Sequence, residues 1–98
     1  MLVMVKEALS EKIHVRQIYL FGSRAKGSFR NDSDYDFAIV SPDFEGMPFL
    51  KRQQLVRPVI RKALGTVPLD VVCYTPEEFR RGSKAFLPRI IGEEGIAA

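Results

Sequence analysis

Apolar residues recur along the chain at two spacings, which predict an alternation of helices and strands. The first set has helical spacing and comprises Leu2, Val5, Leu9 and Ile13. It predicts an amphipathic helix over residues 2–13. A β-rich run over residues 15–21 then stops at Gly22, as a strand that enters a turn does. A second strand is expected from about Asp34 to Ser41, followed by a turn-rich surface loop.

The longest helical pattern covers residues 48–64, where Pro48 can open the helix. Its apolar face is formed by Val56, Val59, Ile60, Ala63 and Leu64. Its basic residues lie mainly elsewhere around the helix and are Lys51, Arg52, Arg57, Arg61 and Lys62. One face is therefore expected to pack and the other to be basic and solvated. Pro58 interrupts the pattern, so we expect a kink or two helical pieces joined there.

The last third of the chain predicts one more strand and two helices. Residues 68–74 read as a strand, and Thr75 with Glu78 forms a capping box for a helix that begins at Pro76. A tail helix is expected from the spacing of Phe86, Leu87, Ile90 and Ile91. Three strands are few for a doubly wound sheet, so the expected fold class is α/β (α+β), with a small mixed β-sheet flanked by helices. We expect a single domain over residues 1–98.

Composition narrows the class of protein. Apolar residues make up 46% of the chain and charged residues 28%, which is typical of a globular protein. The net charge of +3 fits an anionic ligand such as a triphosphate, but it is too small to establish nucleic-acid binding. The single cysteine, Cys73, cannot form a disulfide within one chain, so a cytoplasmic location is expected. No window approaches the ~20 apolar residues of a membrane span, so no membrane role is expected.

Two aspartates provide the first candidate chemistry. Residues i and i+2 of a strand project to the same face, so Asp34 and Asp36 direct their carboxylates the same way. Two such charges about 4 Å apart repel by roughly 4 kcal/mol at an effective dielectric of about 20. A hard divalent cation, above all Mg²⁺, relieves this repulsion best. An isolated Asp-x-Asp is also typical of an exposed acidic turn, so the surrounding residues decide between the two.

The residues before this pair favour a phosphate-binding turn. Gly22 and Ser23 stand where a strand ends, and the segment Ser23–Lys26 can begin a helical turn whose free N–H groups bind phosphate oxygens. Gly27 closes this turn. Later in the chain, Asp70 offers a third acidic ligand or a general base, although alone it would be an ordinary carboxylate at a strand edge. The interpretation as a site for a metal ion and a phosphate rests on the glycine turn, the aspartate pair and Asp70 together.

Other phosphate and metal motifs do not match. A P-loop requires Gly-x4-Gly-Lys, and residues 22–27 have the glycine spacing, but Ser28 replaces the lysine. A calcium-binding EF-hand loop that began at Asp32 would place Phe37 at its obligatory glycine position. The dinucleotide fingerprint Gly-x-Gly-x-x-Gly is absent.

The three-part pattern resembles the signature of the DNA polymerase β-like nucleotidyltransferase superfamily, and most closely its minimal nucleotidyltransferases. The residues that carry the resemblance are Gly22-Ser23-Arg24-Ala25-Lys26-Gly27, Ser33-Asp34-Tyr35-Asp36 and Asp70. They cover about a fifth of the chain, and the expected order of helices and strands is similar over nearly all of it. Lys26 stands where arginine is frequent in such proteins.

The resemblance implies a polymerase β palm-like fold and a function. ATP or another nucleoside triphosphate would be the donor and two Mg²⁺ ions the cofactors, with a nucleoside monophosphate transferred to an acceptor hydroxyl. Gly22 and Ser23 would hold the triphosphate, which Arg24 and Lys26 would contact. Asp34 and Asp36 would bind both metals, and Asp70 would complete the site and help to activate the acceptor.

The acceptor remains open at this stage. Minimal nucleotidyltransferases often act with a separately encoded helical HEPN-domain protein, some of them as antitoxins that add AMP to it. The alternative is a non-catalytic nucleotide-binding module that neutralises a partner by binding alone. A third possibility is an RNA or small-molecule acceptor, for which the basic face of residues 52–62 is the only support.

Overall fold

The computed structural model describes residues 1–22, 34–82, 91, 93 and 95–98. The predicted helical turn at residues 23–27 lies outside the described residues, and so does most of the predicted tail helix. Of that tail helix, Ile91 is described, helical and buried.

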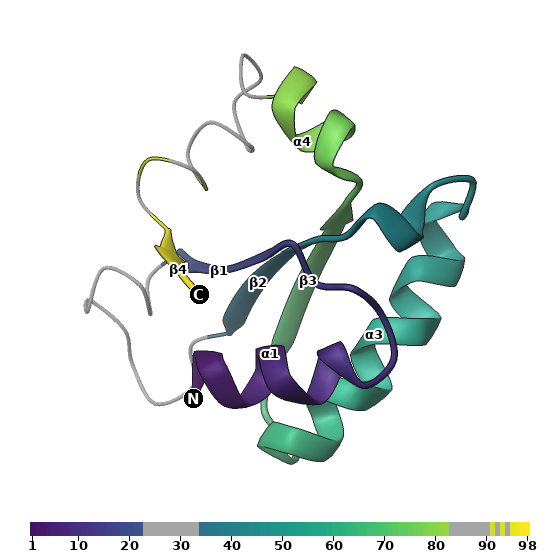
Figure 1. Cartoon of the computed structure of the whole chain (residues 1–98). Coiled ribbons are helices and arrows are strands. Elements are labelled where there is room, and N and C mark those ends of the chain that lie inside the picture. Colours follow the sequence, from purple (N-terminus) through teal and green to yellow (C-terminus); the bar gives the residue numbers. More distant parts are fainter. Residues whose placement is uncertain (23–33, 83–90, 92, 94) are drawn as a thin grey trace.

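A mixed sheet forms the centre of the fold, as predicted, and the described residues contribute four strands to it where three were expected (Figure 1). Its strands are β1 (Gln17–Phe21), β2 (Tyr35–Val40), β3 (Leu69–Tyr74) and β4 (Ile96–Ala97), in the order β3-β2-β1-β4. β1 is antiparallel to both β2 and β4, whereas β2 and β3 are parallel. The short strand β4 was not predicted.

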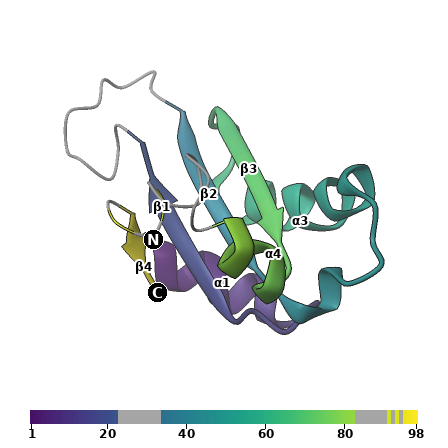
Figure 2. The ribbon, with the colours of Figure 1, turned by 90° about the horizontal axis from the view of Figure 1, so that it is seen from above.

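Helices cover both faces of this sheet (Figure 2). α1 (Leu2–Ser10) and α3 (Phe49–Leu64) pack against each other on one face, and α4 (Pro76–Arg81) lies on the other. The 3-10 helix η1 (Pro42–Phe44) connects β2 to α3. Among the described residues, no helix is both long and apolar enough to cross a membrane.

α3 runs through Pro58 as one helix, so the alternative of two separate pieces is wrong. Proline removes the hydrogen bond to the carbonyl four residues earlier, which belongs to Gln54. Both Pro58 and Gln54 are exposed, so water can bind that carbonyl and the helix continues.

The core lies between the sheet and the α1–α3 pair. Its fully buried members include Val5, Leu9, Ile18, Phe37, Ile39, Val56 and Ile60. In β1 and β3, buried residues alternate with more exposed ones, because successive side chains of a strand point to opposite faces and only one face lies against the core. The alternate residues therefore face α4, where the Phe79 ring stacks on Tyr19 at 5.3 Å between centroids and meets Tyr74 at 5.7 Å. This second face carries the candidate site.

The predicted solvation of the basic helix face is wrong for Arg52, which is only 9% exposed. Its guanidinium donates to both carboxylate oxygens of Glu78, at 2.6 and 3.1 Å. It also donates to the carbonyl oxygens of Met47 at 2.8 Å and Cys73 at 3.2 Å. Glu78 in turn completes the predicted capping box with Thr75, which the structure confirms. Arg52 thus ties α3, β3 and α4 together.

We expect Arg52→Met to lower the free energy of unfolding by about 2–3 kcal/mol, because it removes charged hydrogen bonds and leaves carbonyls unpaired. The matched control is Arg81→Ala. Arg81 pairs with Glu77 at 2.8 Å, but both side chains are more than half exposed, so the loss should stay below about 1 kcal/mol. Urea unfolding at pH 7 measures both values. Equal losses would contradict the role given to Arg52.

The ion pair also predicts a pH dependence. The hydrogen bond from Arg52 lowers the pKa of Glu78 below its ordinary 4.5. The pair therefore stabilises the fold fully above pH 4.5, and its contribution is lost as the pH falls through the lowered pKa. The difference in unfolding free energy between wild type and Glu78→Gln should shrink between pH 5 and about pH 3. A difference that stayed constant over that range would contradict this assignment.

Candidate active site

The strand register places two of the predicted carboxylates side by side. Asp36 on β2 is the partner of Asp70 on β3 and of Phe21 on β1. Paired residues of neighbouring strands project to the same face of a sheet. The residues that follow them, Phe37 and Val71, are buried in the core, so both aspartates point to the opposite face. Asp34 is exposed and lies directly before β2.

The negative charges of Asp34 and Asp70 act on the carboxylate of Asp36. The pKa of Asp36 is raised above its ordinary 3.8, first by burial and then by the negative charges of Asp70 and Asp34. In the described part of the chain, however, no group of three or more His, Cys, Asp or Glu side chains is placed to hold a metal ion. The donor set has the hard oxygen chemistry that suits Mg²⁺, and exposed Asp34 and Asp70 have room to turn toward a cation.

Gly22 lies against the carboxylate of Asp36. Its φ of +75° is in the left-handed region that favours glycine. A Cβ built on Gly22 would collide with the Oδ2 atom of Asp36 and lie 3.2 Å from its Cγ atom. Any larger residue would therefore displace this carboxylate. The end of β1 and the start of β2 thus bring the first residue of the predicted phosphate turn to the predicted metal site.

The other predicted nucleotide contacts, Ser23, Arg24 and Lys26, lie outside the described residues. Gly22, Asp36 and Asp70 are the predicted site residues that the structure brings together. The contact between Gly22 and Asp36 was not predicted, because it depends on the pairing of β1 with β2.

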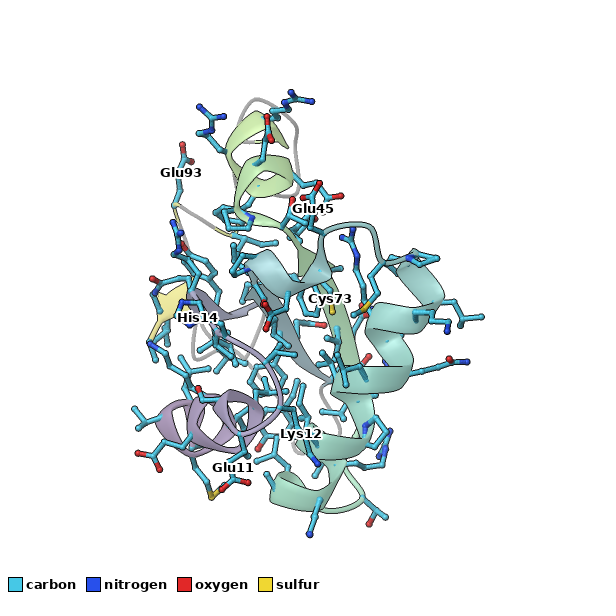
Figure 3. The ribbon with its side chains drawn as sticks, turned by 45° about the vertical axis from the view of Figure 1, so that its right-hand side comes forward. Glu11, Lys12, His14, Glu45, Cys73 and Glu93 are labelled. Carbon is cyan, nitrogen blue, oxygen red and sulfur yellow. The ribbon has the colours of Figure 1, made fainter. Side chains whose placement is uncertain are left out.

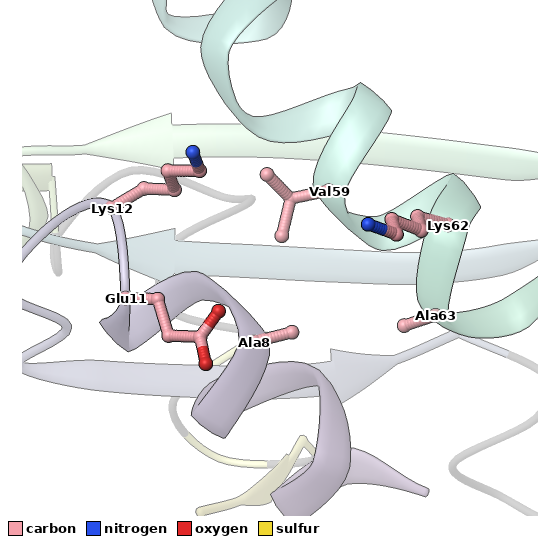
Figure 4. Close-up of a pocket in the computed structure, with 6 residues that line it drawn as sticks. All are labelled: Ala8, Glu11, Lys12, Val59, Lys62 and Ala63. Atoms are coloured by element: carbon pink, nitrogen blue, oxygen red, sulfur yellow. The ribbon is translucent and has the colours of Figure 1, made fainter.

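Two cavities lie away from these residues. The first, of about 330 Å³, opens between α1 and α3, on the opposite face of the sheet (Figure 4). It is lined by Ala8, Glu11, Lys12, Val59, Lys62 and Ala63. The second, of about 390 Å³, lies beside α4 and is lined by Phe49, Arg52, Val72, Cys73, Tyr74, Glu78 and Gly82. Neither is lined by Gly22 or by any of the three aspartates, so neither is assigned to the donor nucleotide.

Neither Cys73 nor His14 joins the site. Cys73 lies on the core side of β3 (Figure 3). Burial there raises the pKa of its thiol to about 12, so the thiol stays protonated at neutral pH. His14 precedes β1, whereas Gly22 follows the other end of that strand. The backbone N–H of His14 donates to the carboxylate of Asp43 at 2.8 Å. The candidate chemistry therefore depends on carboxylates.

The family comparison identifies the class of protein to which this chain belongs. The nucleotidyltransferase domain family matches residues 2–98. The chain belongs to this family and is a nucleotidyltransferase. The family works with a nucleoside triphosphate donor and a divalent metal. A search of curated proteins finds no sequence match.

Solved structures share the fold. A candidate nucleotidyltransferase from Sulfolobus solfataricus is 24% identical with a TM-score of 0.63, covering 97% of this chain and 72% of its own. A toxin–antitoxin structure with AMP-PNP is 23% identical with a TM-score of 0.68, covering 97% of this chain and 69% of its own. BolA1 from Arabidopsis thaliana is 26% identical with a TM-score of 0.60, covering 79% of this chain and 93% of its own. The arrangement of helices and strands alone therefore does not define the activity, and the family match does.

The contact between Gly22 and Asp36 predicts a separation of activity from stability. Gly22→Ala should reduce nucleotide transfer about 10-fold or more, because the new methyl group displaces the carboxylate. Gly46→Ala is a matched control, since Gly46 has a φ of +74° with nothing within 4 Å of the added Cβ. Both variants should lose about 1–2 kcal/mol of stability from backbone strain, but the control should keep its activity. Equal activities would contradict the contact.

The crowding of negative charge predicts that Asp36→Asn stabilises the fold while it abolishes activity. Ionisation of Asp36 costs stability because its pKa is raised, so this cost is absent below pH 3.8 and complete above the raised pKa. After allowance for solvent screening, we expect a gain of about 0.5–1 kcal/mol at pH 7. Thermal melts should show this gain vanishing near pH 3, and Glu7→Gln, an exposed control, should change little. A loss of stability at pH 7 would contradict the account.

Proposed function

We propose that this nucleotidyltransferase moves AMP from ATP to a hydroxyl of a partner protein, in a reaction that depends on Mg²⁺. The observation that carries the proposal is the pairing of Asp36 with Asp70, with Gly22 against the carboxylate of Asp36. This arrangement offers oxygen donors for a cation directly beside a glycine turn suited to phosphate. We further propose that residues 1–98 form one domain that acts in the cytoplasm, where ATP and Mg²⁺ are available.

Each site residue has a role in this proposal. Gly22 and Ser23 hold the triphosphate, and Arg24 and Lys26 contact it. Asp34 and Asp36 bind two Mg²⁺ ions. A bound divalent cation would neutralise phosphate charge and polarise the phosphoryl oxygens. The exposed carboxylate of Asp70 completes the site as a third metal ligand, and its second oxygen accepts the proton of the acceptor hydroxyl.

The proposed reaction is an in-line displacement. The acceptor oxygen forms a bond to the α-phosphorus of ATP, and the bond from this phosphorus to the bridging oxygen breaks, which releases pyrophosphate. The proton of the acceptor hydroxyl passes to the carboxylate of Asp70. This chain therefore acts mainly by positioning the donor and stabilising its charge.

A protein acceptor is the first to test. The likeness to a toxin–antitoxin structure that contains AMP-PNP supports an adenine nucleotide and a partner chain. We propose a helical HEPN-type protein as this partner and an antitoxin role for the transfer.

The basic face of α3, the one feature that favoured an RNA acceptor, is largely explained by contacts within the chain. Three arginines of the basic helix α3 donate to backbone carbonyls of the same chain: Arg52 to Cys73 at 3.2 Å, Arg57 to Leu69 at 3.3 Å and Arg61 to Val67 at 3.0 Å. These contacts explain the arginines without any external phosphate. Lys51 and Lys62 remain, which are too few for a phosphate-binding stripe.

The test is to incubate the purified protein with ATP labelled at the α-phosphate, Mg²⁺ and the product of the neighbouring gene. Label should appear on the partner, and chelation of the metal with EDTA should prevent it. Asp34→Asn and Asp36→Asn should each abolish transfer, whereas Glu7→Gln should retain it. No transfer by the wild type, or transfer that survives the aspartate variants, would refute the proposal.

The same assay separates an enzyme from a binding module. An enzyme that carries Asp70→Asn should no longer neutralise its partner, although the two chains still bind. A module that acts by burying surface should still neutralise the partner after this substitution.

A further inference from the structure

β3 carries Asp70 at an edge of the sheet, and among the described strands only β2 pairs with it. Successive carbonyls of a strand point to alternate edges. Those of Pro68 and Tyr74 accept hydrogen bonds from the backbone N–H groups of Tyr35 and Ser41, on the β2 side, each at 2.9 Å. The carbonyls of Leu69 and Val71 therefore face the open edge, away from β2.

Side chains of α3 bind these outward carbonyls. The Nε2 atom of Gln53 donates to Val71 at 2.7 Å, and the Nη2 atom of Arg57 donates to Leu69 at 3.3 Å. Arg61 continues the series one turn later by donating to Val67 at 3.0 Å. Four helical residues rise about 6 Å, and two strand residues rise about 6.6 Å, so the two repeats match. α3 thus stands along the edge where a neighbouring strand would otherwise pair.

Asp70 lies between the two carbonyls that Gln53 and Arg57 hold. Its own carbonyl faces β2 by the same alternation, so the backbone around it is fixed from both edges. We propose that Gln53 and Arg57 are positioning residues, which set the place of the Asp70 carboxylate relative to Asp36. This inference rests on the proposed function, in which Asp70 is a metal ligand.

A purely structural role would give a different result. Side chains that cover an edge strand also prevent it from pairing with another chain. In that case, loss of Gln53 would lower stability or cause association, and metal binding by the folded protein would not change. Metal affinity therefore separates the two roles.

The first test measures the dissociation constant of Mn²⁺ by electron paramagnetic resonance of the free ion, at a temperature where every variant is folded. Gln53→Ala should weaken Mn²⁺ binding about 10-fold and raise the Mg²⁺ concentration needed for half-maximal transfer by a similar factor. The matched control is Gln54→Ala. Gln54 is the next residue of α3 and is exposed, so its variant should stay within about twofold of the wild type.

The second test uses Arg57, so that the inference can still be tested if Gln53→Ala does not fold. Arg57→Ala should weaken Mn²⁺ binding in the same direction as Gln53→Ala. Arg57→Lys keeps a donor on a long side chain and should restore most of the affinity. If both Arg57 variants matched the wild type, and Gln53→Ala lowered only the melting temperature, the positioning role would be refuted.

The third test asks whether Gln53 acts through Asp70. In a background of Asp70→Asn, the further change Gln53→Ala should have little effect on Mn²⁺ binding, because the group that it positions is gone. An equal weakening in both backgrounds would contradict the inference. If Asp70→Asn alone left Mn²⁺ binding and transfer unchanged, the role of Asp70 in the proposed function would fail as well. If Asp70→Asn had its full effect while the Gln53 and Arg57 variants had none, only the positioning role would fail.

Discussion

The parallel pairing of β2 with β3 is the constraint on which the rest of the structure depends. Parallel neighbours cannot be joined by a tight turn, so the chain must cross one face of the sheet between them. Here η1 and α3 make that crossing. The crossing buries Val56 and Ile60 against the sheet and leaves Asp36 and Asp70 on the opposite face. The same connection therefore completes the core on one face of the sheet and leaves the other face to the candidate active site.

The return path of α3 explains a second feature of the fold. The helix runs antiparallel to the edge strand β3. Successive side chains of α3 therefore donate hydrogen bonds to successive carbonyls on the side of β3 that faces away from β2. The basic character of α3 is thus largely a consequence of its place beside an edge strand. Arg52 extends the same contact to α4 through Glu78, so one buried side chain of α3 holds both β3 and the helix that follows it.

The carboxylate face is less favourable for stability than the opposite face. Burial and two neighbouring charges raise the pKa of Asp36, which means that ionising it costs free energy in the folded state. Gly22 adds a left-handed backbone conformation at the same place. Such features often occur at functional sites, where the surrounding structure compensates for them. The core and the Arg52–Glu78 pair provide that compensation on the other elements.

Local signals in the sequence were sufficient for much of the fold. The capping box at Thr75 and Glu78 and the helical spacing of Val56 and Ile60 depend on residues a few positions apart, and both are confirmed. Features set by distant partners could not be predicted. The burial of Arg52 requires Glu78, 26 residues away, and β4 spans only two residues, too few for an alternating pattern.

The site shows the same division between local and distant information. The shared face expected for Asp34 and Asp36 follows from strand geometry, whereas Asp70 could join them only if its strand lay next to theirs, which no local pattern specifies. The register that places Asp70 opposite Asp36 became visible in the structure. The contact of Gly22 with Asp36 likewise depends on strand pairing and could not be read from the motif. The catalytic and binding roles of all the predicted site residues, with Ser23, Arg24 and Lys26 among them, stay predictions.

The central claim is that the carboxylate face of the sheet binds a divalent cation together with the nucleotide. Paramagnetic broadening of amide signals by Mn²⁺, recorded in the presence of a non-hydrolysable ATP analogue, tests it most directly. The account predicts strong broadening at Gly22, Asp36 and Asp70, with the outer surfaces of α1 and α3 unaffected. Broadening centred between α1 and α3, or a pattern unchanged by Asp36→Asn, would contradict it.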